Sequence, residues 1–176
     1  MIALAATALA AAPALAAGPN SVYGLYGDNS EISVYGAGAS FDWLRKDAPG
    51  TGSFAARIDA EIAYWHGKDR AASDRSLWAA GVMPVFRWTF LQTQGASLFA
   101  EAGLGVHLLS KTRINSDRRF GTAFQFGELG GIGVAFGPKL AYEVELELQH
   151  VSNGGIRHDA NWGETFPALA LRVALP

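Results

Sequence analysis

The histidine and serine of the segment His150-Val-Ser152 are the residues of this chain whose types and spacing are best suited to chemistry. A serine hydroxyl becomes an effective nucleophile when a histidine accepts its proton, and the histidine works best when a carboxylate binds its other ring nitrogen. Glu164 follows at the beginning of the next apolar segment, and an asparagine and two glycines come directly after the serine. Small residues there let backbone N–H groups approach a developing oxyanion. The segment therefore predicts nucleophilic catalysis by a serine.

The residues before this pair have the pattern of a β-strand. Between residues 142 and 149, apolar side chains alternate with Glu143, Glu145, Glu147 and Gln149. The same period of two recurs along the chain, in stretches of about ten residues between turn-like segments, which indicates strands rather than helices. It predicts eight strands, over residues 20–27, 31–45, 53–66, 75–89, 96–109, 119–136, 139–152 and 164–175.

The two faces of these strands favour a closed barrel in a membrane. The glycine-rich second face suits a narrow barrel, and Arg57, Arg87 and Arg172 can pair with the glutamates in a polar interior. Aromatic residues fall near the predicted strand ends, as interfacial girdles require: Trp43, Tyr64, Trp65, Trp78, Trp88, Trp162 and Phe166. We therefore expect an all-β fold, an eight-stranded antiparallel transmembrane β-barrel, with a soluble lipocalin-like barrel as the alternative. Pro84 falls within a predicted strand, so we expect a bulge there.

The beginning of the chain predicts export. Residues 1–16 form an apolar segment that ends in Ala14-Leu15-Ala16, as in a signal peptide cleaved near Ala16/Ala17, which leaves residues 17–176 as a single barrel domain. After this segment there is no run of 18 apolar residues, so no transmembrane helix is expected. The absence of cysteine excludes thiol catalysis and cysteine-ligated metal, and a net charge of −2 gives no bias toward nucleic acid.

An even number of strands also gives an orientation. Both termini then lie on the periplasmic side, so residues 67–75, 110–118 and 153–163 become external loops. In and beside these loops lie seven of the fourteen Lys and Arg residues, which can attract anionic head groups. His150 and Ser152 share the parity of the apolar, lipid-facing side at the external end of their strand. A polar pair facing lipid costs on the order of several kcal/mol if it is unsatisfied, so catalysis explains it better than a structural role does.

Five segments stand out together: "HVSNGGI" (150–156), "NWGE" (161–164), "MPVFRW" (83–88), "EAGLGVHLLS" (101–110) and "GTAFQFGELGGIGVAFG" (121–137). With them the chain resembles the outer-membrane lipid A 3-O-deacylases of the PagL type, over essentially the whole mature region. The resemblance implies an eight-stranded barrel with Ser152 as the nucleophile, His150 as the base and Glu164 as the carboxylate that orients it. It also implies that Asn153 and Gly155 help to form the oxyanion hole.

The resemblance further implies an activity, a location and partners. Members of the family hydrolyse the ester-linked 3-hydroxyacyl chain at the 3-position of lipid A, in the outer leaflet of the bacterial outer membrane, without a metal or other cofactor. The expected partners are lipid A within lipopolysaccharide and outer-membrane lipid, not nucleic acid, and a homodimer is an assembly that the sequence leaves open. In "RHDANWGE" the glutamate follows the glycine directly, which departs from the family pattern, so Asp159 is an alternative carboxylate to Glu164.

Two other functions compete with this one. An outer-membrane phospholipase also uses a His-x-Ser arrangement, but that family needs twelve strands and a calcium site, for which about 160 mature residues are too few. A non-catalytic small barrel with a structural or adhesive role predicts aliphatic or aromatic side chains at positions 150 and 152, and the sequence has neither.

Overall fold

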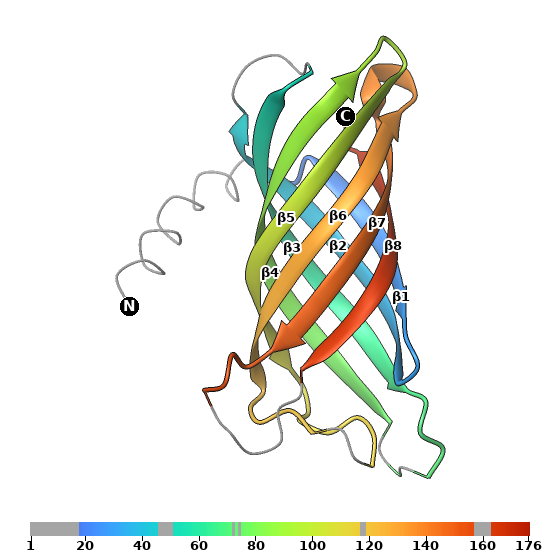
Figure 1. Cartoon of the computed structure of the whole chain (residues 1–176), viewed down its shortest axis with the longest axis vertical. Coiled ribbons are helices and arrows are strands. Elements are labelled where there is room, and N and C mark those ends of the chain that lie inside the picture. The colour runs from blue at the N-terminus through green and yellow to red at the C-terminus, as the bar shows by residue number, and fades with distance from the viewer. Residues whose placement is uncertain (1–17, 46–50, 72, 74, 117–118, 157–162) are drawn as a thin grey trace.

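The computed structural model describes residues 18–45, 51–71, 73, 75–116, 119–156 and 163–176, so the predicted signal peptide lies outside the described residues. Within them the chain forms eight strands: β1 (Ser21–Asp28), β2 (Ile32–Arg45), β3 (Ser53–Gly67), β4 (Ser76–Gln92), β5 (Ala96–Leu109), β6 (Phe124–Phe136), β7 (Tyr142–Ser152) and β8 (Glu164–Ala174). A short 3₁₀ turn, η1 (Pro138–Leu140), precedes β7. Each strand is antiparallel to the next, and β8 pairs with β1 to close the barrel (Figure 1). The predicted all-β, eight-stranded antiparallel barrel is confirmed. In the described part of the chain, no helix has the length and hydrophobicity that a membrane crossing requires.

The outer surface of the barrel is apolar. Alternate residues of each strand point outward, and large side chains such as Leu104, Ile132 and Leu146 are about 60% exposed, at 63%, 60% and 60%. Large apolar residues are exposed on every strand. Together they form an apolar surface far larger than a soluble protein leaves exposed to water. The surface is therefore suited to hydrocarbon, as the predicted transmembrane barrel requires.

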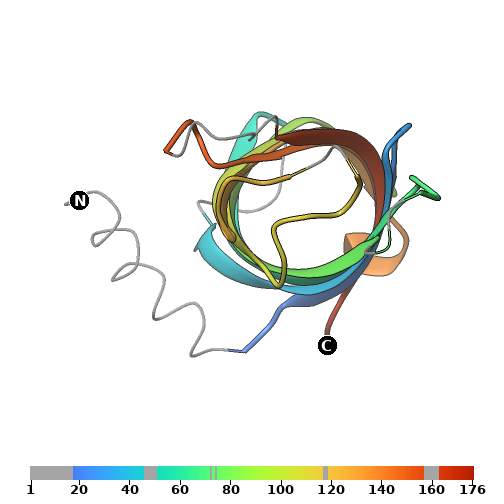
Figure 2. The ribbon, with the colours of Figure 1, turned by 90° about the horizontal axis from the view of Figure 1, so that it is seen from below.

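The interior near the end that holds the β7–β8 connection is filled by apolar side chains. Trp65 packs edge-on against Phe120 and Phe166, with ring centroids 6.1 and 5.4 Å apart. Ile114 and Phe120 come from the β5–β6 connection, which lies across the barrel opening when it is viewed from this end (Figure 2). We call this group the apolar plug; it comprises Ile32, Val34, Trp65, Leu77, Leu109, Ile114, Phe120, Val151 and Phe166.

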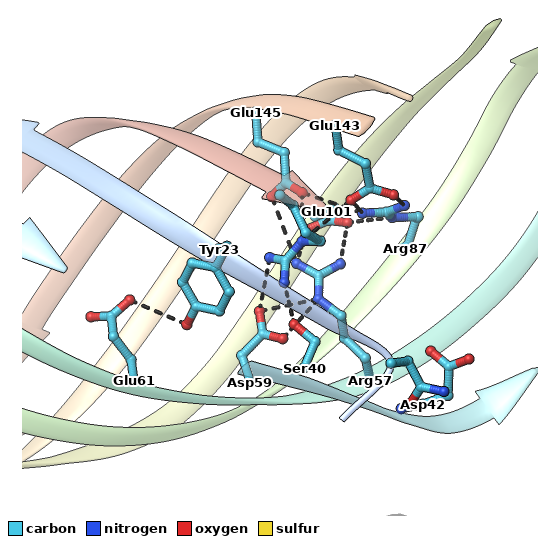
Figure 3. Close-up of polar contacts among 12 residues, drawn as sticks. Tyr23, Ser40, Asp42, Arg57, Asp59, Glu61, Arg87, Glu101, Glu143 and Glu145 are labelled. Carbon is cyan, nitrogen blue, oxygen red and sulfur yellow. Dashed lines mark hydrogen bonds and ion pairs between the residues drawn. The ribbon is translucent and has the colours of Figure 1, made fainter. Parts of the chain in front are cut away.

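The other half of the interior holds a network of ion pairs (Figure 3). The guanidinium of Arg57 donates to both oxygens of Glu101 at 2.5 and 2.7 Å and to Asp59 at 2.9 Å. Arg87 donates to both oxygens of Glu143 at 2.5 and 2.7 Å. The network also includes Arg172, Ser40 and Glu145. The predicted pairing of interior glutamates with arginines is confirmed, and it satisfies charges that would otherwise be costly to bury. Toward the end of the barrel that holds the beginning of β1 and the end of β8, the interior opens into a cavity of about 500 Å³.

Two of the aromatic residues expected in the interfacial girdles lie inside the barrel instead. Trp65 and Phe166 are each 1% exposed, because strand alternation turns them inward, where they form the centre of the apolar plug. Trp78 and Trp88, at opposite ends of β4, point outward as predicted and are 53% and 46% exposed. Trp162 lies outside the described residues. A position near a strand end therefore identifies a girdle residue only when the side chain also points outward.

The bulge expected at Pro84 is wrong. Val82 pairs with Val106 of β5 and Val85 with Gly103, so the register is the same before and after the proline. Because Pro84 has no N–H, the ladder to β5 is interrupted there, but no extra residue is inserted and the strand does not shift. The register shifts of the barrel occur elsewhere, between Asp42 and Leu44 and between Thr89 and Leu91.

Candidate active site

His150 and Ser152 lie at the C-terminal end of β7. Their side chains are on the outward face of the barrel, as the alternation of the sequence predicts. Leu146 and Leu148, four and two residues before His150, are 60% and 56% exposed. Val151, between the histidine and the serine, is buried in the apolar plug. His150 and Ser152 are themselves partly exposed. The pair therefore continues the lipid-facing row of β7 at the point where the strand ends.

Gly163, directly before β8, brings the two side chains together. Its backbone is left-handed, with φ of 64°. A Cβ built on it would lie 2.8 Å from Cε1 and 3.1 Å from Nε2 of His150, and 3.0 Å from Cβ of Ser152. The Nε2 edge of the imidazole and the serine thus border the same small space over the glycine. Among the described residues no direct hydrogen bond joins them; catalytic hydrogen bonds often tighten only when substrate binds.

The other ring nitrogen of the histidine faces β8. Nδ1 of His150 lies 2.7 Å from Oγ1 of Thr165, within hydrogen-bonding distance. The two residues are directly opposite one another in the β7–β8 ladder, and both point outward. Side chains at such opposed positions have Cβ atoms about 4.5–5.5 Å apart, which a threonine hydroxyl and an imidazole can bridge. The ring therefore contacts Thr165 on one edge, and its Cε1–Nε2 edge lies beside Gly163, as Ser152 does.

Glu164, the carboxylate expected to orient the histidine, is the first residue of β8. It is opposite Val151 in the ladder, shares the inward parity of that residue and is 4% exposed. Its Oε1 accepts a hydrogen bond of 2.7 Å from Nδ2 of Asn29. Asn29 also donates to the backbone oxygen of Thr165 at 2.8 Å. This asparagine follows β1, which pairs with β8 on the side away from β7. The alternative carboxylate, Asp159, lies outside the described residues.

The residues expected to form the oxyanion hole make a tight turn after the serine. The N–H of Gly155 donates to Oδ1 of Asn153 at 3.0 Å, and the N–H of Ile156 donates to the backbone oxygen of Asn153 at 3.2 Å. Gly154 and Gly155 have φ values of 60° and 76°, which side chains with a Cβ rarely adopt. Asn153 is fully buried. The asparagine thus holds the backbone that immediately follows Ser152.

Together these groups can perform acyl transfer. A serine and a histidine border one space, the histidine is anchored from behind, and a rigid turn of small residues follows the serine. The described residues contain no group of three or more His, Asp or Glu side chains placed to hold a metal ion.

The chain is similar to known proteins of one family. The model of the family described as Lipid A 3-O-deacylase (PagL) matches residues 33–174. This chain belongs to that family. A curated member, Lipid A deacylase PagL of Bordetella bronchiseptica (strain ATCC BAA-588 / NCTC 13252 / RB50), is 36% identical over 95 residues, which are 54% of this chain and 49% of that protein. The chain thus spans about half the length of the curated PagL relative that it matches.

A solved PagL structure extends the similarity to the whole barrel. The structure described as the crystal structure of the outer membrane enzyme PagL superposes with a TM-score of 0.74, at 25% identity, and covers 88% of this chain and 99% of that chain. With this fold and its apolar outer surface, the present PagL-family chain is an integral outer-membrane barrel.

Three residues of the site escaped the sequence interpretation: Asn29, Gly163 and Thr165. Thr165 follows Glu164 directly, and only the strand register decides which of the two faces the histidine. Gly163 was part of the PagL-like segment "NWGE", but its contact with both side chains depends on a backbone conformation that the sequence does not specify. Asn29 is more than 130 residues from its partner in β8, and only closure of the barrel brings it there.

Proposed function

We propose that this protein is a lipid A 3-O-deacylase, a serine esterase that hydrolyses the ester-linked 3-hydroxyacyl chain at the 3-position of lipid A. One observation carries the proposal: His150 and Ser152 meet over Gly163 on the outward face, at the end of β7. A soluble esterase would open such a site to water in a cleft. Here the nearest outward neighbours on the same strand are exposed leucines, so the substrate that reaches the serine is a lipid.

The position along the barrel selects the part of the lipid that is cleaved. The pair lies where the apolar row of β7 ends and the loops begin, close to the depth at which head groups meet acyl chains. The ester bonds of lipid A lie at that boundary. We place the site at the external leaflet, because an even number of strands puts both termini on the periplasmic side. Exposed basic residues of the external segments, such as Arg113 and Arg119, are suited to the phosphates of lipid A.

The reaction follows from the roles of the side chains. Nε2 of His150 accepts the proton of Ser152 as the serine oxygen attacks the ester carbonyl. The turn at Asn153 and Gly155 stabilises the oxyanion, with the N–H of Gly155 exchanging its bond to Oδ1 of Asn153 for one to the substrate oxygen. The histidine then protonates the leaving 3-oxygen of the sugar, and an acyl-serine remains. Water, deprotonated by the same histidine, releases the 3-hydroxy fatty acid. In this proposal Glu164, at the beginning of β8, is the carboxylate that orients His150, and its Oε1 accepts a hydrogen bond from Asn29.

Mass spectrometry of lipid A tests the proposal. Cells that produce the protein should contain lipid A that has lost one 3-hydroxyacyl group from the 3-position, and Ser152→Ala should abolish this loss while the barrel still assembles. Ser76→Ala is the matched control, because Ser76 is also an outward serine at the external end of a strand, β4, far from Gly163.

The result also separates the competing functions. A phospholipase-type esterase would release fatty acid from glycerophospholipids and leave lipid A unchanged. A non-catalytic barrel would change neither. Deacylation of lipid A by the Ser152→Ala variant at the rate of the unmodified protein would refute the assignment of the nucleophile.

A further inference from the structure

We propose that Glu128 is a substrate-binding residue of this site and that its carboxylate accepts a hydrogen bond from the hydroxyl of the 3-hydroxyacyl chain. The inference rests on the proposed function and names a residue that selects its substrate. Glu128 is the only charged residue of β6, and it is exposed on the outward face of the barrel. It is directly opposite His150 in the β6–β7 ladder. A carboxylate therefore lies on the lipid-facing surface, beside the strand that carries the base and the nucleophile.

The carboxylate of Glu128 faces the membrane without a hydrogen bond or ion pair to any of the described residues. Its opposing residue on β5 is Leu104, which is 63% exposed. On β7, Nδ1 of His150 lies against Thr165 of β8, on the side of β7 away from β6. A charged group that faces hydrocarbon is unfavourable unless a polar group meets it. The lipid substrate can supply that group.

The position of Glu128 along the barrel decides which polar group of the lipid it meets. Ser152, the last residue of β7, is opposite Phe126, and Glu128 is two residues farther from the external end of β6. At about 3.3 Å per residue, Glu128 lies about 7 Å along the strand toward the membrane interior. The sugar of lipid A is on the external side of the cleaved ester, and the acyl chain is on the inner side.

The polar group of the acyl chain is its 3-hydroxyl, which is two carbons from the ester carbonyl. Diagonal neighbours on adjacent strands are about 7–8 Å apart, a separation that a long side chain can bridge. The carboxylate of Glu128 can therefore reach this hydroxyl while the carbonyl is at Ser152. An ionised carboxylate only accepts hydrogen bonds, so the hydroxyl donates.

The acyl chain can continue past Glu128 without meeting a side chain on β6. The next outward residue of this strand is Gly130, which pairs with Ala102 of β5. A Cβ built on Gly130 would meet no atom within 4 Å. Hydrocarbon can therefore lie against the backbone directly beyond the carboxylate, as the chain that carries the hydroxyl requires.

Two glucosamine lipids that differ in one hydroxyl test the inference. One carries a 3-hydroxytetradecanoyl ester at its 3-position, and the other carries a tetradecanoyl ester there. The full-length protein in detergent micelles should hydrolyse the hydroxylated ester with kcat/KM on the order of 10- to 100-fold higher, because a hydrogen bond to a charged acceptor contributes about that factor.

Substitutions of Glu128 should change the ratio of the two kcat/KM values. Glu128→Leu continues the leucine surface and should bring the ratio to about one, by slowing the hydroxylated ester and not the other. Glu128→Gln keeps an acceptor without the charge and should give an intermediate ratio. Ser76→Leu is the control, because it places a leucine on the outward face at the external end of β4, and it should leave both rates unchanged.

The outcomes separate the inference from the proposed function. An equal fall in both rates in Glu128→Leu would overturn the inference, because the carboxylate would then act on His150 and not on the substrate. An unchanged ratio in Glu128→Leu would overturn it as well. If the unmodified protein hydrolyses neither ester, the proposed function fails, and binding of the two lipids to Ser152→Ala protein decides the inference. Tighter binding of the hydroxylated lipid that is lost with Glu128→Leu would support it, and equal binding of the two lipids would refute it.

Discussion

The glycine between the histidine and the serine gives the sharpest test of the site geometry. In Gly163→Ala, the new Cβ would lie 2.8 Å from Cε1 of His150 and 3.0 Å from Cβ of Ser152. Ordinary contacts to a Cβ begin at 3.4 Å, so the imidazole and the serine must each move by several tenths of an ångström. The residue also has φ of 64°, which costs an alanine about 1–2 kcal/mol. The substitution thus combines a backbone cost with a displacement of the two reacting groups.

The two effects are separated by comparison with another glycine. Gly52 has φ of 83°, and a Cβ there would meet no atom within 4 Å. Gly52→Ala therefore carries the backbone cost without the displacement. Both variants should lower the free energy of unfolding by about 1–2 kcal/mol, measured by denaturant titration in detergent. Only Gly163→Ala should lose activity, on the order of 10-fold in the release of hydroxy fatty acid from lipopolysaccharide, because a 1 Å misplacement of reacting groups costs about 100-fold and the two groups move by about half that distance.

A Gly163→Ala variant with the kcat of the unmodified protein and a stability loss equal to that of Gly52→Ala would refute the reasoning. It would mean that His150 and Ser152 do not meet over Gly163 during the reaction. Loss of activity in both variants would instead indicate a general effect of backbone strain on the barrel.

Three further substitutions test the parts of the barrel that hold the site. Arg57→Met leaves Glu101 and Asp59 without their shared partner and should destabilise the barrel by about 3–5 kcal/mol in denaturant unfolding; no loss of stability would show that the interior network is dispensable. Trp65→Ala empties the centre of the apolar plug and should cost about 3–5 kcal/mol, with a fall in activity at temperatures where the variant is still folded; full activity there would separate the plug from the site. Asn29→Ala removes both hydrogen bonds that its amide donates to β8, so kcat should fall and stability should drop by about 1–3 kcal/mol; an unchanged kcat would show that the beginning of β8 needs no clamp.

The strands of this barrel could be predicted from the sequence because each lies between two unlike environments. Lipid outside and an ion-pair network or apolar plug inside impose a period of two, and β5 begins and ends at the residues predicted for it. The ends of β6 and β7 match the prediction, but their beginnings were predicted too early, because the residues before Phe124 and Tyr142 continue the alternation although they belong to turns. The inward positions of Trp65 and Phe166 were missed for a related reason, since aromatic residues at a strand end suit an interfacial girdle or an apolar plug equally well.

The candidate site was predicted as far as a single strand determines it. His150 and Ser152 belong to β7, so their shared outward face follows from the alternation of that strand alone. The partner of the histidine belongs to β8, and there the sequence offers Glu164 and Thr165 on opposite faces. The preference of a catalytic histidine for a carboxylate favours the glutamate, and the register of β8 also places the hydroxyl of Thr165 at Nδ1, which strand alternation in β7 alone does not predict.

The same alternation couples the site to the interior. Val151 lies between His150 and Ser152 and is 1% exposed within the apolar plug, so burial of its side chain fixes the outward direction of both neighbours. On β8, Phe166 does the same for Thr165, and it packs on Trp65 across the barrel interior. A polar pair that faces lipid has no packing of its own to hold it, because hydrocarbon chains are fluid. The positions of these two side chains must therefore be fixed by the packing of the inward-facing residues on the same strands. A protein that works on a membrane lipid from the outside of a narrow barrel therefore needs a dry, well-packed interior at the depth of the reaction, and the charged network is confined to the other half, where it does not compete with that packing.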